Sequence, residues 1–208
     1  MGLIIFDFDG TVADTRSTIL HTVEATVEKM KWPELDLEKV AGAIGLPLKA
    51  NFTIGASMPD DIADEAVMIY RELFNGIATQ HATLFPGAME TLGTLSSRGV
   101  PMAIATSRTV ESLKFLMEQL GIDGFITNLY GAGCVENPKP APDMVLLILD
   151  RMGFSPSETL VVGDTTYDLE MGRNAGCYTC GVTYGNHSVQ QLAAVRPDYL
   201  IDDLRKLL

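Results

Sequence analysis

The stretch from Ile4 to Thr11, Ile-Ile-Phe-Asp-Phe-Asp-Gly-Thr, restricts the fold of this chain more than any other segment. Its apolar run predicts a strand buried on both faces, as in a parallel sheet, and Gly10 predicts that the chain turns away where the run ends. Side chains alternate along a strand, so Asp7 and Asp9 are expected to lie on the same side, at the edge where open α/β sheets hold their functional groups. Two carboxylates this close repel each other without a nearby cation or proton, so the pair predicts a functional site. An Asp-Gly pair also forms ordinary solvated turns, and the rest of the chain has to separate the two interpretations.

After residue 84 the chain alternates between helix and strand patterns. Strands are expected at 101–105, 125–130, 159–162, 177–182 and 199–201, and helices at 88–97, 110–120, 143–152, 167–175 and 189–195. Alternating elements joined by short turns predict a parallel sheet covered by helices. Together with the first strand, they predict an α/β fold with a doubly wound, Rossmann-like parallel-sheet core.

Residues 15–83 show helical patterns and no strand pattern. Apolar residues recur at helical spacing from Ser17 to Met30. Further helices are expected at 36–44 and at about 60–78. The sequence therefore predicts two domains, a core of residues 1–14 and 84–208 and a small α-helical cap of residues 15–83 inserted after the first strand.

Charge and hydrophobicity restrict the partners of the protein. The 208 residues carry a formal net charge of −12, and 47% of them are hydrophobic, which is typical of a globular protein. No basic run offsets the negative charge, so we expect neither nucleic acid nor a membrane as a partner. No apolar stretch approaches the roughly 20 residues that span a bilayer, and the start lacks a signal-like segment. We expect a cytoplasmic protein, either a monomer or a homodimer.

Polar groups follow three of the predicted strands, and a lysine lies in a proline-rich turn. The segments are Asp7-Phe-Asp9-Gly-Thr11, Thr106, Lys139 within Asn137-Pro-Lys-Pro-Ala-Pro142, and Gly163-Asp164-Thr-Thr-Tyr-Asp168. In this order they resemble the four signature motifs of the haloacid dehalogenase superfamily, from about residue 3 to the C-terminus. The helical segment after the first motif is similar to the α-helical cap of that superfamily. Two further segments, Ile44-Gly-Leu-Pro-Leu48 and Gly181-Val-Thr-Tyr-Gly185, are similar in sequence to the phosphoglycolate phosphatase-like branch of that superfamily.

The resemblance implies a catalytic role for four side chains. Asp7 is the nucleophile that forms an aspartyl-phosphate, and Asp9 protonates the leaving group and then deprotonates the attacking water. Thr106 hydrogen-bonds the phosphoryl group, and Lys139 neutralises the charge that develops on it. Arg108 is a further candidate for contact with the phosphate.

The resemblance also implies Mg²⁺ as the cofactor. Its ligands are Asp7, Asp164 and the backbone carbonyl of Asp9, because Mg²⁺ prefers hard oxygen donors. Asp168 completes the site directly, through water, or by holding Lys139.

The predicted function is a Mg²⁺-dependent phosphatase that hydrolyses a small phosphorylated metabolite, with 2-phosphoglycolate as the leading candidate on resemblance. Lys49 or Arg71 could bind a carboxylate of the substrate. A β-phosphoglucomutase-like sugar phosphomutase and an inorganic pyrophosphatase are alternatives. A non-catalytic phospho-aspartate switch is another, although it needs no acid at Asp9. A dehalogenase is disfavoured by Asp9, Asp164 and Asp168, because that branch does not keep the second aspartate and does not need the metal-binding acids.

Overall fold

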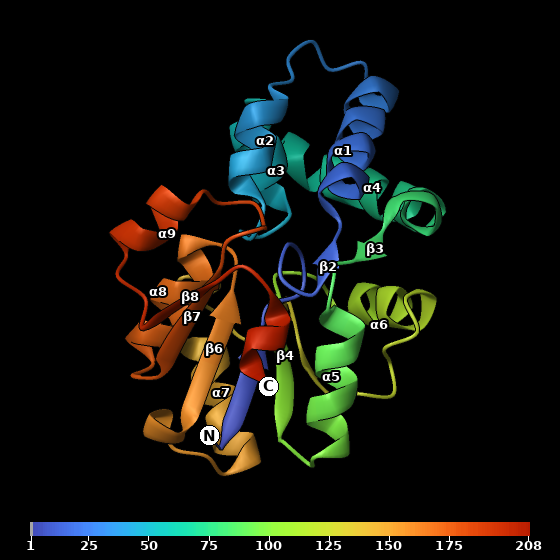
Figure 1. Ribbon diagram of the computed structural model, residues 1–208. Helices are drawn as coiled ribbons and strands as arrows, with labels where there is room; N and C mark the ends of the chain where they lie inside the picture. Colours follow the sequence, from blue (N-terminus) through green and yellow to red (C-terminus); the bar gives the residue numbers. More distant parts are fainter. Residues whose placement is uncertain (1) are drawn as a thin grey trace.

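Six parallel strands form the main sheet of the computed structural model, which describes residues 2–208 (Figure 1). They are β1 (Leu3–Phe6), β4 (Met102–Ala105), β5 (Asn128–Tyr130), β6 (Thr159–Gly163), β7 (Tyr178–Val182) and β8 (Tyr199–Ile201). Across the sheet their order is β5-β4-β1-β6-β7-β8. The chain fills one half of the sheet from β1 outward and then returns beside β1 to fill the other half. This is the doubly wound order, and it confirms the predicted fold class.

Helices cover both faces of this sheet because the side chains of each buried strand alternate between them. The helices are α5 (Ala88–Ser97), α6 (Val110–Gln119), α7 (Asp143–Met152), α8 (Thr166–Asn174) and α9 (Val189–Ala194), with short 3-10 helices η1 (Pro156–Glu158) and η2 (Leu204–Leu207). Ile4 and Phe6 of β1 pack in one apolar cluster with α5 and α6, and Leu3 and Ile5 pack in a second cluster with α7 and α8.

Four of the five helices between β1 and β4 lie together beyond the carboxyl ends of the strands (Figure 1). They are α1 (Arg16–Met30), α2 (Leu37–Ala43), α3 (Lys49–Gly55) and α4 (Asp60–His81). Asp36 begins α2 by accepting hydrogen bonds from the backbone N–H groups of Glu38 and Lys39. The apolar sides of these helices meet around Phe52, Tyr70 and Phe74, whose rings are in contact. We call α1–α4 the cap helices.

The sequence does not predict α3 or the ribbon that joins the cap helices to the sheet. Helix α3 has seven residues, too few for a helical repeat to be recognised, and the burial of Phe52 stabilises it. The ribbon consists of the antiparallel strands β2 (Ala13–Asp14) and β3 (Thr83–Leu84). Because β3 begins at Thr83, the expectation of no strand within 15–83 is wrong at its last residue. The division into a core of 1–14 and 84–208 and a cap of 15–83 stays a prediction.

None of the helices within residues 2–208 combines the length and the apolar character that a membrane crossing requires.

Candidate active site

The predicted site residues lie where the strand order reverses. Asp7 follows β1, Thr106 follows β4 and Asp164 follows β6, and these strands are neighbours at the centre of the sheet. The chain leaves β1 toward β4 and leaves the neighbouring β6 toward β7, so the two connections run to opposite edges of the sheet. A crevice forms between them at the carboxyl ends of the central strands, where doubly wound sheets bind ligands. The topology therefore brings together residues more than 150 positions apart, as shown by the hydrogen bond between Thr11 and Asp164.

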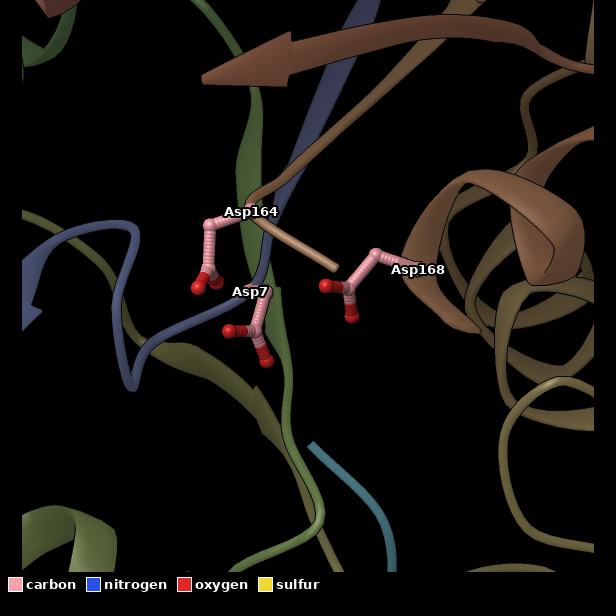
Figure 2. Close-up of side chains that lie close together, drawn as sticks. All are labelled: Asp7, Asp164 and Asp168. Atoms are coloured by element: carbon pink, nitrogen blue, oxygen red, sulfur yellow. The ribbon is translucent and has the colours of Figure 1, made fainter. Parts of the chain in front are cut away.

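Three carboxylates meet at this crevice. Figure 2 shows the side chains of Asp7, Asp164 and Asp168 pointing toward one another, and one oxygen of each lies within 4.8 Å of the others. All three residues are buried, with at most 4% of their surface exposed. Asp168 is held in place at the start of α8, where its Oδ2 accepts hydrogen bonds from the backbone N–H and the hydroxyl of Thr165. We call these three residues the acidic cluster.

Lys139 is the cation inside the acidic cluster. Its ammonium group is fully buried and donates hydrogen bonds of 2.6 Å to Oδ1 of Asp7 and 2.6 Å to Oδ1 of Asp168. Burial alone would lower the pKa of Lys139, but the neighbouring Asp168 and Asp7 outweigh it and raise that pKa. Lys139 therefore stays charged, and one positive charge faces three carboxylates.

The electrostatics of the acidic cluster favour a divalent cation. Burial, followed by the repulsion from Asp168, raises the pKa of Asp164 to about 7, and the same two causes raise the pKa of Asp7 well above its ordinary value. Carboxylates that ionise this reluctantly gain from a nearby positive charge. Three convergent oxygen donors with one lysine fit a hard divalent ion, so the acidic cluster could bind one.

Asp164 is fixed by residues from two loops. Its Oδ1 accepts a hydrogen bond of 3.0 Å from the hydroxyl of Thr11, and its Oδ2 accepts hydrogen bonds from the backbone N–H (2.7 Å) and side-chain amide (2.9 Å) of Asn186. The close approach requires glycine at position 10, because a Cβ there would lie 2.2 Å from Oδ2 of Asp164, and at position 185, where a Cβ would lie 2.2 Å from Cβ of Asp164. Sequence reasoning missed Asn186, although a polar residue soon after β7 was a signal of the same kind as Asp164 after β6.

The carboxylate of Asp9 is not one of the three that form the acidic cluster. Strand β1 ends at Phe6, so the alternation that predicted Asp9 on the side of Asp7 does not extend to it. Its carboxylate instead accepts hydrogen bonds from the Arg108 guanidinium, at 2.8 Å from Nε to Oδ2 and 2.7 Å from Nη2 to Oδ1, and another from the Thr15 hydroxyl. The role of its backbone carbonyl as a metal ligand stays a prediction.

Arg108 links this carboxylate to the cap helices. Its guanidinium lies 4.4 Å from the centre of the Phe74 ring in α4 and also donates to the hydroxyl of Ser112. Burial alone would lower the pKa of Arg108, but the negative charge of Asp9 outweighs the effect of burial and raises that pKa. Thr106 lies beside this pair, buried to 1% exposure, and its hydroxyl oxygen accepts a hydrogen bond from the backbone N–H of Arg108.

A cavity of about 530 Å³ extends from Asp7 and Asp9 to the cap helices. Its walls come from both sides of the crevice, and the Ser107 hydroxyl joins them with a hydrogen bond of 2.6 Å to the carbonyl of Gly45. Many lining side chains are apolar, including those of Leu46, Leu48, Val67, Tyr70, Phe74 and Phe115. The groups that could react with phosphate thus lie at one end of a chamber that has room for a substrate.

The two cations that the sequence proposed for a substrate carboxylate differ in their surroundings. Lys49 lines the cavity but forms ion pairs with Asp60 at 3.2 Å and Asp64 at 3.0 Å. Arg71 also lines the cavity and is exposed. The two aspartates thus hold Lys49, and Arg71 is the more available of the two.

The chain is similar to several known proteins in sequence, and to a solved structure in fold. The chain is 36% identical to "Probable phosphatase IndB" of Dickeya dadantii, covering 99% of this chain and 91% of that protein. It is 32% identical to the pyrophosphatase PpaX of Bacillus velezensis (99% and 94% covered) and 31% identical to a phosphoglycolate phosphatase of Escherichia coli K12 (99% and 90% covered). A solved structure from Bacteroides fragilis, described as a haloacid dehalogenase-like hydrolase, superposes with a TM-score of 0.92 at 26% identity, with 99% of each chain covered.

The sequence pattern of one enzyme family covers most of the chain. It matches residues 4–182, a range that includes the acidic cluster, Lys139 and Thr106. The match extends over more than half of the 208 residues, as the resemblance of the four motifs predicted. The chain belongs to the haloacid dehalogenase-like hydrolases.

Proposed function

We propose that the protein is a Mg²⁺-dependent phosphatase that hydrolyses a small phosphorylated metabolite through an aspartyl-phosphate on Asp7. The observation that carries the proposal is that Asp7 belongs to the acidic cluster and also lines the cavity. Lys139 binds its Oδ1, and this leaves Oδ2 as the oxygen for attack. The relatives named phosphatases support the same reaction class.

In the first step an oxygen of the Asp7 carboxylate attacks the phosphorus. The bond from phosphorus to the leaving oxygen breaks, its electron pair goes to that oxygen, and the oxygen takes a proton from Asp9. Both oxygens of Asp9 accept hydrogen bonds from Arg108, so the guanidinium has to move before Asp9 carries this proton. The phosphoryl oxygens of the substrate are a competing partner for Arg108.

In the second step water hydrolyses the aspartyl-phosphate. Asp9, now a carboxylate, takes a proton from the water as its oxygen bonds to phosphorus, and the bond from phosphorus to Asp7 breaks. Inorganic phosphate leaves, and the Asp7 carboxylate is restored. Lys139 and the hydroxyl of Thr106 hold the phosphoryl group and oppose its charge in both steps.

Mg²⁺ is the divalent ion we propose for the acidic cluster, held by Asp7 and Asp164 with the carbonyl of Asp9. Asp168 acts directly, through water or through Lys139. When bound, the ion neutralises charge on the phosphoryl oxygens and orients them for in-line attack.

Relatedness alone makes 2-phosphoglycolate the leading substrate candidate, because the phosphoglycolate phosphatase of Escherichia coli is 31% identical to this chain. Pyrophosphate is a second candidate, supported by the Bacillus velezensis relative. We propose that the protein works in the cytoplasm as a monomer or homodimer. With its net charge of −12 we expect no nucleic acid or membrane partner.

The proposed function is tested by measuring phosphate release from a panel of small phosphoesters and pyrophosphate. Release is expected with Mg²⁺ and is expected to stop when a chelator removes the ion. A sugar phosphomutase would return the phosphoryl group to a sugar and release little phosphate, and a phospho-aspartate switch would keep it on Asp7. A folded protein that releases no phosphate from any of these compounds would refute the phosphatase.

Mg²⁺ should also change how stability depends on pH. Without a divalent ion, the contribution of Asp164 to the free energy of unfolding is expected to fall by about 2–4 kcal/mol as the pH rises from 3.8 to about 7. Over that window the folded protein keeps a proton on Asp164 that the unfolded chain has already lost, so rising pH favours unfolding. Mg²⁺ opposes this loss, so we expect it to raise the Tm more at pH 8 than at pH 5. Equal Tm shifts at the two pH values would contradict metal binding at the acidic cluster.

A further inference from the structure

One buried polar atom that faces no partner belongs to a residue of the cavity wall. Within residues 2–208, three buried side-chain oxygens lack a hydrogen-bond partner, those of Thr18, Asn51 and Thr91. Of these residues only Asn51 lines the cavity, and it is 5% exposed. A buried amide oxygen without a partner destabilises a fold, and in a cavity wall a ligand can supply the missing hydrogen bond.

Asn51 lies opposite the reacting groups, on the cap side of the cavity. It belongs to α3, the short helix that follows the apolar wall residues Leu46 and Leu48. Asp7 and Asp9 line the same cavity from the sheet side. With the phosphoryl group at Asp7, the part of the substrate that departs would extend toward α3. Asn51 is therefore placed to contact the leaving group rather than the phosphate.

The cations around the cavity are mostly engaged. Lys49 is paired with Asp60 and Asp64, and Arg108 with Asp9. The carboxylates of Asp64 and Glu111 also belong to the lining residues. Arg71 is exposed, so solvent and salt screen its attraction for an anion. A leaving group with its own negative charge would find little buried positive charge in this cavity that is not already paired with a carboxylate.

The cavity is also large for a two-carbon leaving group. Its volume of about 530 Å³ falls in the range of pockets that enclose drug-sized ligands. 2-Phosphoglycolate adds only a two-carbon acid to its phosphoryl group, and pyrophosphate adds a second phosphate. Neither would fill the space between Asp7 and the apolar walls.

We propose that Asn51 selects the substrate, and that the preferred substrate is a phosphate monoester whose leaving group is uncharged, larger than glycolate and able to hydrogen-bond to the Asn51 amide. The inference rests on the proposed phosphatase function and narrows its substrate class. It favours substrates with an uncharged leaving group over 2-phosphoglycolate, whose leaving group carries a carboxylate. Relatedness alone puts 2-phosphoglycolate first.

The test compares specificity constants of the full-length protein with Mg²⁺. Two probes have uncharged hydrogen-bonding leaving groups, uridine 5′-monophosphate and ribose 5-phosphate. Phenyl phosphate has an uncharged leaving group without hydrogen-bonding groups, and 2-phosphoglycolate and pyrophosphate have charged ones. We expect at least one of the first two probes to have a higher kcat/KM than both charged compounds.

The variant Asn51→Leu removes the amide at nearly constant shape. Relative to phenyl phosphate, kcat/KM for the preferred hydrogen-bonding probe is expected to fall about tenfold or more. Because the variant removes an unpaired polar atom, its Tm should be equal to or higher than that of the native protein. Thr91→Val is the matched control, since it removes another buried unpaired oxygen away from the cavity and should keep the ratio. If Asn51→Leu does not fold, Asn51→Asp replaces it and should depress 2-phosphoglycolate more than uridine 5′-monophosphate.

Three outcomes would overturn the inference. One is preference for a charged compound over both hydrogen-bonding probes. Another is an unchanged ratio in Asn51→Leu. The third is an equal loss for every ester together with a lower Tm, which would make Asn51 a structural residue only. None of these three outcomes contradicts the proposed phosphatase function. That function would be refuted if the native protein released no phosphate from any of the compounds in the presence of Mg²⁺.

Discussion

Replacing Asp7 with asparagine should abolish phosphate release while leaving the protein folded. The asparagine amide cannot attack phosphorus, and removal of a catalytic nucleophile typically lowers kcat by about four orders of magnitude or more. Burial and the neighbouring Asp168 already raise the pKa of Asp7, so the neutral residue relieves repulsion inside the acidic cluster. We therefore expect a Tm equal to or above that of the native protein. The measurements are phosphate release at saturating substrate and thermal unfolding on the same preparation.

This pair of measurements separates chemistry from folding. Loss of activity with an unchanged or higher Tm is the expected combination. Activity within tenfold of the native protein would remove Asp7 from the nucleophile role, and the aspartyl-phosphate mechanism with it. A much lower Tm would show that the Asp7 carboxylate stabilises the fold through Lys139, contrary to the excess of negative charge around it.

Replacing Lys139 with glutamine should have the largest effect on stability. The lysine is fully buried and is the only cation that an ion pair places within the acidic cluster in the described part of the chain. Breaking a buried ion pair by removing one partner costs about 3–5 kcal/mol, because uncompensated charge stays behind. The loss should be larger at pH 8 than at pH 5, because protons neutralise the orphaned carboxylates at lower pH. Urea unfolding at both pH values measures it.

Lys29→Gln is the matched control for Lys139→Gln. Lys29 forms an exposed ion pair with Glu72 at 3.3 Å, and exposed pairs contribute only about 0–1 kcal/mol. A loss at position 139 no larger than at position 29 would contradict the electrostatic account of the acidic cluster. Added Mg²⁺ should recover part of the stability of Lys139→Gln, because it supplies positive charge to the same carboxylates.

Much of the fold was predictable because its signals are local. Buried parallel strands are apolar throughout and end at polar or glycine residues, so Ile4–Phe6 and Thr159–Val162 were recognised from composition alone. Helix α2 was recognised because Asp36 caps it. Helix α3 was missed because seven residues hold too little periodicity, and the β2–β3 ribbon was missed because each strand has only two residues.

The candidate site was predictable to the extent that its residues lie in short motifs. Asp7, Thr106, Lys139 and Asp164 follow strands or lie in a distinctive turn, and the structure brings all four to one edge of the sheet. Their catalytic roles stay predictions. Other residues were missed or left uncertain because they do not belong to a recognisable short motif. Among them are Asn186, Arg108 as the partner of Asp9, and Asn51.

The sequence by itself determined the α/β class and the family, and it predicted the helical cap and the residues of the site. Those properties are encoded by periodicity and by residue types a few positions apart. Only the tertiary structure decided that the carboxylate of Asp9 pairs with Arg108, that aspartates hold Lys49, and that the Asn51 oxygen remains unpaired beside the cavity. These contacts depend on where separate loops meet across the crevice, and the burial of distant apolar surfaces, not local preference, sets that arrangement.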